Sequence, residues 1–320
     1  MAPVVTTIVT VYKRTKFLRQ AIKSVLSQTL RPLEIIVTDD SDSNEIKSIC
    51  DAFQLPEIRY RSNPVRLGVA LNLRAAISEA KGQYIAILND DDLWEPEFLD
   101  CLVLPLEQNK NRVLAFSDHW IMLENGEIDL QQTEENTIRY GRSNLNEGEV
   151  IDVASFVIVN NGIPLAMASV FRKDALNLQL LVAEVSGAYD FWISCLLAAN
   201  KQPIYYLPKR LTRYRVHETM ETARKSFDKN ENMVFIFRKL IEENYFPNLR
   251  RNLRKKYQQA LFICGKDNLF FDRISMTRKY FNQSIRIYPN WKTFVGLILT
   301  YLPQNIRLRL RITKVKNVLG

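Results

Sequence analysis

The 320-residue sequence has few of the residues that build several common kinds of site. Its four cysteines lie at positions 50, 101, 195 and 264 and form no CxxC pair. This spacing argues against a zinc ribbon or a disulfide framework, and it fits a reducing cytosol. No apolar run reaches the ~18 residues that a membrane-spanning helix needs. Residues 4–11 are rich in threonine and valine and follow no basic region, so we expect no signal peptide.

Glycine-rich phosphate loops are missing as well. The chain has no GxGxxG after its first predicted strand and no GxxxxGK followed by Ser or Thr. A nucleotide bound here would therefore be held by a metal ion on its phosphates, without a backbone cradle. The net charge of +9 is moderate, and we expect no nucleic-acid partner.

Three consecutive carboxylates, Asp90, Asp91 and Asp92, directly follow an apolar run. Residues 84–88 predict a buried strand that ends at these acids, and residues 97–106 predict a helix after them. Adjacent carboxylates repel one another unless a cation neutralises them. Oxygen ligands suit Mg²⁺ or Mn²⁺. The alternative interpretation is a solvated acidic turn that caps the following helix.

Strands and helices alternate along the first 90 residues. The patterns predict strands at 4–12, 33–38, 58–61 and 84–88, with helices at 17–28, 44–53 and 70–80 between them. Such alternation implies an α/β fold with a mostly parallel sheet. The second strand ends at Asp39 and Asp40, so both acidic groups should meet at the carboxyl edge of the sheet. For Asp39 and Asp40, the alternative is a locally capped turn.

The chain resembles the family 2 glycosyltransferases of the GT-A fold in three motifs, TIVTVYKRTKFLRQAIKSVLSQTLRPLEIIVTDDSDS, NPVRLGVALNLRAA and GQYIAILNDDDLWEPEFL. The resemblance covers about the first two thirds of the chain. It implies a Rossmann-like domain that binds a nucleotide-sugar. The nucleotide contacts that it implies are Thr10, Tyr12, Asp40, Asn72 and Asp90.

The resemblance also implies a metal site. Counted back from Pro96, the metal-binding aspartate of the family falls on Asp91, with Asp92 beside it and Mn²⁺ or Mg²⁺ as the ion. The opening aspartate of the motif falls on Asn89, which is a departure from the family pattern. Residues 214–217 resemble the YRxH segment of the family, which implies that His217 approaches the metal or the diphosphate. A lone histidine is otherwise an ordinary surface or core residue.

Residues 187–192 resemble the EDYDLWLRL segment of the family, whose acidic residue is the general base. Gly187 and Ala188 stand in place of the ED pair, so the resemblance points to Asp190 as the base and to Glu184 as the next candidate. It also implies inversion by a single in-line displacement. Without the resemblance, a carboxylate at a helix N-terminus is more often a cap.

Two polar stretches predict loops near this site. Residues 129–148 carry many Glu, Asn and Arg side chains and predict a mobile surface loop over the site. Residues 218–225 predict a loop that becomes ordered over bound nucleotide.

Beyond residue 230 the pattern predicts only helices, at about 234–245, 250–265 and 273–288. Residues 291–302 form a short apolar stretch bounded by aromatic side chains. A basic tail follows it, with Arg307, Arg309, Arg311, Lys314 and Lys316. Such a segment suits the surface of an anionic membrane. The alternative is a core helix with a solvated tail.

We therefore predict a GT-A domain at residues 1–225 and a helical C-terminal region at 226–320, with a membrane-surface segment at 291–316. The enzyme would be cytoplasmic, peripheral at the inner face of the plasma membrane. It would move a sugar from a nucleotide-diphosphate sugar, with a UDP-sugar as the first choice, to a hydroxyl of a saccharide or lipid-linked saccharide.

Two other functions fit parts of the pattern. A catalytically idle GT-A domain would serve as a nucleotide-sugar-binding or assembly module, and the departure at Asn89 is compatible with it. A sugar nucleotidyltransferase would share the sheet and the metal, but it would carry a GxGTR-type loop after the first strand. Residues 11–15 contain no glycine.

Overall fold

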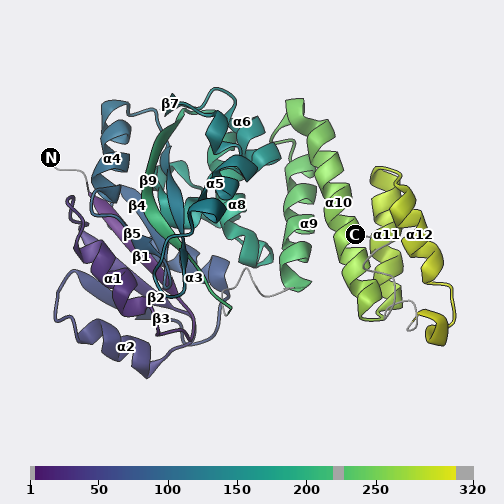
Figure 1. Ribbon diagram of the computed structural model, residues 1–320, viewed down its shortest axis with the longest axis horizontal. Helices are drawn as coiled ribbons and strands as arrows, with labels where there is room; N and C mark the ends of the chain where they lie inside the picture. The colour runs from purple at the N-terminus through teal and green to yellow at the C-terminus, as the bar shows by residue number, and fades with distance from the viewer. Residues whose placement is uncertain (1–3, 219–226, 308–320) are drawn as a thin grey trace. The chain divides into compact units, whose positions relative to one another are not determined.

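The N-terminal part of the chain is built on one mixed sheet of nine strands (Figure 1). The computed structural model describes residues 4–218 and 227–307, and contacts divide the chain into two compact units, Met1–Arg224 and Lys225–Gly320. The strand order is β3-β2-β1-β4-β8-β6-β9-β5, and β7 pairs with β9 outside this path.

The strands are β1 (Val5–Val11), β2 (Glu34–Asp39), β3 (Ile58–Ser62), β4 (Tyr84–Asn89), β5 (Leu93–Trp94), β6 (Leu114–Leu123), β7 (Gly148–Glu149), β8 (Ser169–Arg172) and β9 (Ile204–Val216). The helices of the first unit are α1 (Leu18–Leu26), α2 (Asn44–Asp51), α3 (Val69–Glu79), α4 (Phe98–Gln108), α5 (Leu130–Arg139), α6 (Val153–Ser155), α7 (Leu165–Ala168) and α8 (Tyr189–Ala199). The longer ladders, β1 with β2 and β4, β2 with β3, and β6 with β9, are parallel. The antiparallel pairings are shorter, so the predicted α/β fold with mostly parallel strands is confirmed.

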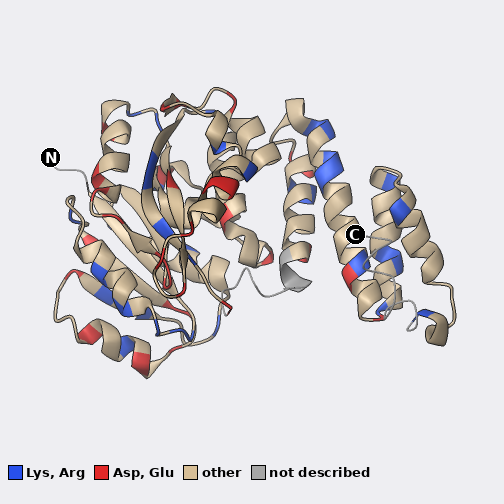
Figure 2. Cartoon of the chain, viewed as in Figure 1, with Lys and Arg blue, Asp and Glu red and all other residues tan. Residues whose placement is uncertain are grey.

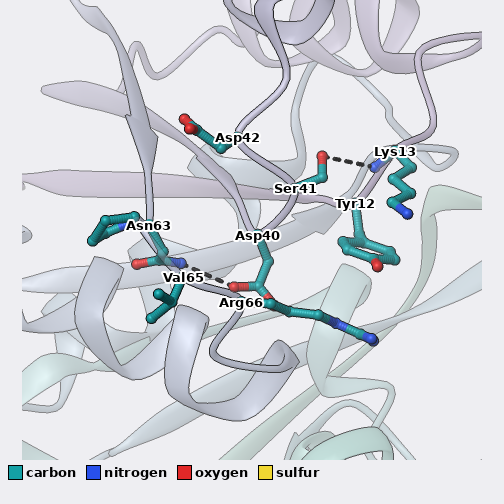
Figure 3. A pocket seen from close by; sticks show the side chains of 9 residues that line it. Tyr12, Lys13, Asp40, Ser41, Asp42, Asn63, Val65 and Arg66 are labelled. Carbon is teal, nitrogen blue, oxygen red and sulfur yellow. Dashed lines mark hydrogen bonds between the residues drawn. The ribbon is translucent and has the colours of Figure 1, made fainter.

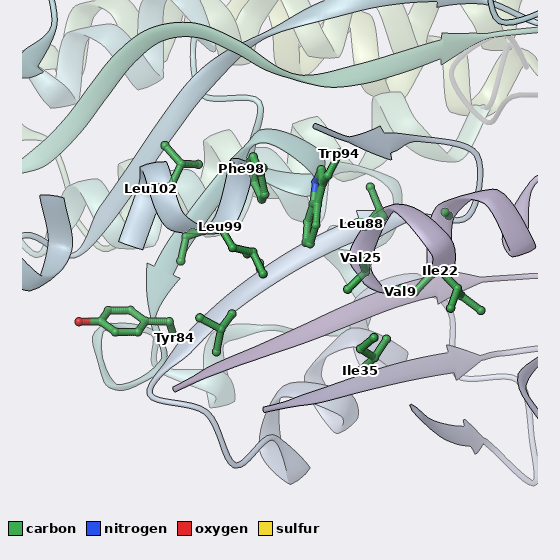
Figure 4. Close-up of a cluster of buried hydrophobic side chains, with 14 of the residues drawn as sticks. Val9, Ile22, Val25, Ile35, Tyr84, Leu88, Trp94, Phe98, Leu99 and Leu102 are labelled. Atoms are coloured by element: carbon green, nitrogen blue, oxygen red, sulfur yellow. The ribbon is translucent and has the colours of Figure 1, made fainter. Parts of the chain in front are cut away.

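The hydrophobic core lies between this sheet and its helices (Figure 4). Every residue of β1 is buried, and α1 turns its apolar side chains, Ile22 and Val25 among them, toward the same core. Trp94 stacks on Phe98 with ring centroids 4.3 Å apart, and its indole N–H donates to the carbonyl of Met167 at 2.7 Å. This anchor fixes the chain directly after the three aspartates.

The register of the parallel strands brings both acidic groups to one edge. Thr10 of β1 lies opposite Asn89 at the end of β4, and Val11 lies opposite Asp39 at the end of β2. The loops that follow these strands therefore leave the sheet side by side. The predicted meeting of the two acidic groups at the carboxyl edge is confirmed.

Residues 129–148 are not the mobile loop that the sequence predicts, because they contain helix α5. The Asp129 carboxylate caps this helix by accepting from the N–H of Gln132 at 2.8 Å. Its buried residues are polar, and Thr137 donates to the buried carboxylate of Asp118 at 2.7 Å. Arg142, just after the helix, donates to the other oxygen of Asp118 at 3.0 Å. The helix buries hydroxyl groups in place of apolar side chains, so it has no apolar periodicity to detect.

The second unit consists of α9 (Phe227–Glu242), α10 (Arg250–Phe270), α11 (Ile274–Ile287) and α12 (Trp291–Leu299). Phe281 of α11 packs against glycines of two neighbours, because a Cβ at Gly265 of α10 or at Gly296 of α12 would overlap its ring. No helix within the described ranges is both long and apolar enough to cross a bilayer. The loop predicted at 218–225 falls, apart from its first residue, outside the described residues, and so does the basic tail beyond Arg307.

Candidate active site

Asp90 and Asp91 share one guanidinium group, that of Arg14. Nε of Arg14 donates to Asp90 Oδ2 at 3.1 Å, and one terminal nitrogen contacts the other oxygen of Asp90. The other terminal nitrogen lies 2.8 Å from Asp91 Oδ2. Arg14 follows β1, whose end lies beside the end of β4. Arg14 was not among the residues predicted from the sequence, where its one signal was a basic residue shortly after the first strand.

The end of β9 supplies the other partners of the aspartates. His217 Nε2 lies 3.0 Å from Asp91 Oδ2. Asp92 is fully buried and accepts from the backbone N–H of Arg215 at 2.9 Å. The Arg215 side chain donates through Nε to the carbonyl of Asp91 at 2.9 Å. The structure thus brings His217 together with the acidic motif, and Arg215 holds the backbone of that motif.

Asn89 performs a role that an aspartate could not. Its amide Nδ2 donates to Asp92 at 2.9 Å, and its Oδ1 accepts from the hydroxyl of Thr10 at 3.4 Å. An aspartate in this place would add a fourth negative charge and would lack the donor that Asp92 uses. The departure from the family motif therefore relieves repulsion inside the cluster.

The cluster holds more negative charge than this buried site favours. Burial, together with the charge of Asp91, raises the pKa of Asp90 to about 7, although Arg14 opposes the shift. Burial and the charge of Asp91 also raise the pKa of Asp92. For Arg14, burial acts to lower the pKa, but the charges of Asp90 and Asp91 outweigh it and raise the pKa. An added cation would lower the free energy of such a cluster.

The carboxylates of Asp90 and Asp91 supply only some of the ligands that a hard divalent cation needs. Among the residues that the structure describes, no three His, Cys, Asp or Glu side chains converge as a complete metal site. Asp91 and Asp90 nevertheless both direct carboxylate oxygens toward the guanidinium group of Arg14. Mg²⁺ is commonly bound by one or two carboxylates, with substrate phosphates completing its shell. The residues present fit an ion of that kind.

A pocket of about 260 Å³ opens beside the acidic cluster, between the loops after β1, β2 and β3 (Figure 3). The Arg66 guanidinium lies 4.6 Å from the ring centroid of Tyr12, and the Lys13 ammonium lies 5.3 Å from it. The pocket is lined by Tyr12, Lys13, Asp40, Ser41, Asp42, Asn63, Pro64, Val65 and Arg66. It therefore offers an aromatic ring, two carboxylates and two cations to one small ligand.

Asp40 shapes this pocket by holding the loop before α3. Its Oδ1 accepts from the N–H of Leu67 at 2.8 Å, and its Oδ2 accepts from the N–H of Gly68 at 2.7 Å. Gly68 has φ +82°, a left-handed conformation that favours glycine. Asn63 donates a further hydrogen bond to Asp40 at 3.1 Å (Figure 3). Asp40 therefore organises one wall of the pocket.

Asn72 lies beneath the pocket and is buried. Its Oδ1 accepts from the hydroxyl of Thr38 and from the amide of Asn63, each at 2.7 Å. Asn63 in turn reaches Asp40. The structure thus connects Asn72 to the pocket through Asn63, and a direct nucleotide contact of Asn72 stays a prediction.

Asp190 lies in the first turn of α8, directly after the 3₁₀ segment Ala183–Ala188. That segment is kinked at Ser186, whose φ and ψ are 16° and −108°. Burial and the charge of Asp190 raise the pKa of the neighbouring Tyr189, and the charges of Asp90, Asp91 and Asp92 contribute to this shift. The start of α8 is therefore close to the acidic cluster. Glu184 is exposed on the 3₁₀ segment.

Sequence comparisons agree with this geometry. Residues 6–160 match the model of Glycosyl transferase family 2. A protein described as an uncharacterized glycosyltransferase of Haemophilus influenzae is 26% identical over 258 residues, which cover 74% of this chain and 76% of that one. The GalNAc(5)-diNAcBac-PP-undecaprenol beta-1,3-glucosyltransferase of Campylobacter jejuni is 24% identical over 313 residues, 95% of each chain.

Solved structures agree as well. The crystal structure of S. aureus TarS in complex with UDP-GlcNAc matches 99% of this chain and 89% of its own, with a TM-score of 0.64 at 13% identity. At this identity the match shows the fold, and it confirms the predicted GT-A architecture. The family match at residues 6–160, together with glycosyltransferase relatives that cover most of this chain, shows that the chain carries a Glycosyl transferase family 2 domain and is a glycosyltransferase.

Proposed function

We propose that this glycosyltransferase moves a sugar from a UDP-sugar to a hydroxyl of a lipid-linked saccharide, with inversion and with the help of Mn²⁺ or Mg²⁺. The observation that carries the proposal is the acidic cluster of Asp90, Asp91 and His217, which lies beside the pocket at the same sheet edge. A nucleoside in the pocket would direct its diphosphate toward this cluster.

The pocket supports a nucleoside more than a whole donor. Its volume of about 260 Å³ is below the roughly 300–1,000 Å³ of pockets that hold drug-sized ligands. The base would lie against Tyr12, and Asp40 would accept hydrogen bonds from it. Lys13 and Arg66 lie where they would contact the negative diphosphate. S. aureus TarS has been solved with UDP and with UDP-GlcNAc, and this supports the choice of uridine.

Catalysis needs help at the leaving group and at the attacking hydroxyl. A bound divalent ion would supply positive charge to the departing diphosphate, and Asp91 and Asp90 would hold that ion. Asp92 would stay in place as the partner of Arg215 and Asn89. Asp190 would take the proton from the acceptor hydroxyl as its oxygen bonds to the anomeric carbon. The bond from that carbon to the diphosphate oxygen breaks on the opposite face, so the configuration inverts.

A lipid-linked saccharide is the acceptor that the comparisons favour. The name of the Campylobacter jejuni relative describes glucosyl transfer to an undecaprenol-linked saccharide, and the match with it spans 95% of both chains. The match extends over the helical second unit as well as the catalytic domain. An acceptor of this class is carried by a membrane, which bears on the second unit below.

Calorimetry and transfer assays test the proposal. UDP should bind more tightly than other nucleoside diphosphates, and a chelator should weaken its binding. Asp190→Asn should leave UDP binding unchanged and lower transfer by ~10²–10⁴-fold. Glu184→Gln is the matched control and should behave like the wild type.

Equal UDP affinity with Mn²⁺ and with chelator would refute metal assistance. Full activity in Asp190→Asn would refute the assigned base, and donor binding without any turnover would indicate a binding module.

A further inference from the structure

Helix α12 packs against its own unit with small residues. Thr293, Gly296 and Thr300 are its buried positions, and Gly296 lies against the ring of Phe281. The hydroxyl of Thr300 accepts from Nε of Arg278 at 2.9 Å. The fully buried positions of this helix are therefore small, and its larger contacts with the core come from the partly buried Leu297 and Leu299, which pack against the cluster of Leu269 and Phe281.

Four other large apolar side chains of the same segment are exposed. Trp291 is 63% exposed, Phe294 45%, Ile298 64% and Tyr301 68%. Their spacing of three, four and three residues places them on one face of the helix. A water-exposed helix normally has the reverse pattern, with large apolar residues inside. A contiguous apolar face of this kind marks a surface that binds something.

The sequence of this region carries charge of one sign after Asp272, whose carboxylate pairs with Arg307. Residues 273–320 contain ten Lys and Arg and no Asp or Glu, although the whole chain has a net charge of only +9. Figure 2 shows Lys and Arg positions, coloured blue, along α10 and α11. Lys279 and Arg286 of α11 are exposed, and the Arg278 guanidinium lies 4.0 Å from the ring centroid of Tyr301. The expected ligand is therefore both apolar and anionic.

We propose that the exposed face of α12 binds the surface of an anionic lipid bilayer, with the helix lying in the plane of the headgroups. Trp and Tyr at the two ends of the apolar stripe suit the level of the headgroups, and the basic residues suit anionic lipid. A second copy of this chain fits less well, because a two-fold contact would bring identical positive surfaces together. The inference adds to the proposed function a way to bring the enzyme to a lipid-linked acceptor.

Vesicle flotation tests this binding without any transfer reaction. The full chain should float with vesicles that contain phosphatidylglycerol and should stay at the bottom with pure phosphatidylcholine. Trp291→Ser with Ile298→Ser should reduce the floated fraction at least about tenfold. Leu130→Ser with Ile138→Ser is the matched control, because these residues of α5 are 66% and 64% exposed, and it should float like the wild type. Circular dichroism of each variant checks that it is folded.

Several outcomes would overturn the membrane proposal. The wild type could stay at the bottom with anionic vesicles, or the α12 variant could float as well as the control. Light scattering could instead show a dimer that the α12 substitutions dissolve, which would assign this face to self-association. Transfer to a water-soluble acceptor separates this question from the proposed function, since the α12 variant should retain it.

A second inference concerns Arg14, and it rests on the proposed metal. Arg14 is the group that neutralises Asp90 and Asp91 together in this structure. Its side chain is 33% exposed, so it can leave the cluster without passing through the core. We infer that Arg14 is an internal counter-ion that an incoming divalent cation displaces. The guanidinium group and a divalent cation are both positively charged, so they would repel one another if both lay between the two carboxylates.

Manganese binding in the absence of nucleotide tests this role. Arg14→Gln should bind Mn²⁺ about tenfold more tightly than the wild type in electron paramagnetic resonance titrations. Its melting temperature should fall in chelator and recover when Mn²⁺ is added. Lys16→Gln is the matched control, because Lys16 is an exposed cation nearby that pairs with Glu124, and its affinity should be unchanged.

The outcomes separate this inference from the metal role itself. Equal Mn²⁺ affinity in Arg14→Gln and wild type, with the same loss of melting temperature in Mn²⁺ and in chelator, would show that Arg14 is merely structural. If neither protein binds Mn²⁺ even with UDP present, the proposed metal role fails and the inference fails with it.

Discussion

The two acidic groups at the carboxyl edge of the sheet are held in different ways. In the first group, after β2, Asp39 accepts from the N–H groups of Ser41 and Ser43 and from the hydroxyl of Tyr60, at 2.7 to 3.0 Å. Its neighbour Asp40 is held by backbone and amide N–H groups in the same manner. In the second group, after β4, Asp90 and Asp91 are held mainly by charged or ionisable side chains.

This difference separates a structural group from one that can change its partners. Backbone N–H groups cannot leave Asp39 or Asp40 without unfolding the loops, so the first group keeps its shape. The guanidinium beside Asp90 and Asp91 belongs to a flexible, partly exposed side chain. The second group can therefore exchange one cation for another, as the proposed reaction requires.

The largest expected effect is a loss of turnover in the Asp91→Asn variant. This change removes a carboxylate that contacts both Arg14 and His217. Loss of the charge that is proposed to hold the metal should lower transfer by roughly 10³-fold, because such an ion would supply several kcal/mol at the leaving group. Initial-rate assays with a UDP-sugar measure it. Asp100→Asn, which changes an exposed carboxylate of α4 outside both groups, is the control, and a similar loss of transfer there would show that the effect is not specific to the second group.

The next effect is on stability, and it should differ between the two groups. Asp39→Asn replaces an acceptor oxygen by an amide that faces N–H and O–H donors, which should cost about 1–3 kcal/mol. Asp90→Asn removes a buried charge and keeps an acceptor for Arg14, so it should cost less than about 1 kcal/mol. Urea unfolding in chelator at pH 7 measures both. Equal losses of stability in the two variants would contradict the proposed difference between the two acidic groups.

The sequence predicts the positions of these groups better than their partners. Apolar runs ending in aspartates locate the strand ends, because burial of β1, β2 and β4 leaves a strong pattern. The resemblance adds Asp91 and His217, which the structure brings within 3.0 Å. Arg14 was missed, since its contacts depend on the packing of loops far apart in the chain. Helix α5 was missed because its buried contacts are made by hydroxyl groups.

A last difference concerns the pH dependence of stability in chelator. Asp90 has a pKa of about 7 in the folded protein, raised by burial and by Asp91 from an ordinary value of 3.8. Between these values the folded state holds a proton that the unfolded state has lost. This contribution to stability is therefore present at low pH and is lost as the pH rises from about 4 to about 7.

Asp90→Asn removes that contribution. The unfolding free energy of the wild type, taken relative to the variant, should therefore fall between pH 4 and pH 7, with a slope no steeper than about 1.4 kcal/mol per pH unit. Above pH 7 the difference should be constant, because Asp90 is then ionised in both states. Asp42→Asn should give a curve parallel to the wild type, since Asp42 is exposed. Parallel curves for Asp90→Asn as well would show that the second group carries no more electrostatic strain than the first.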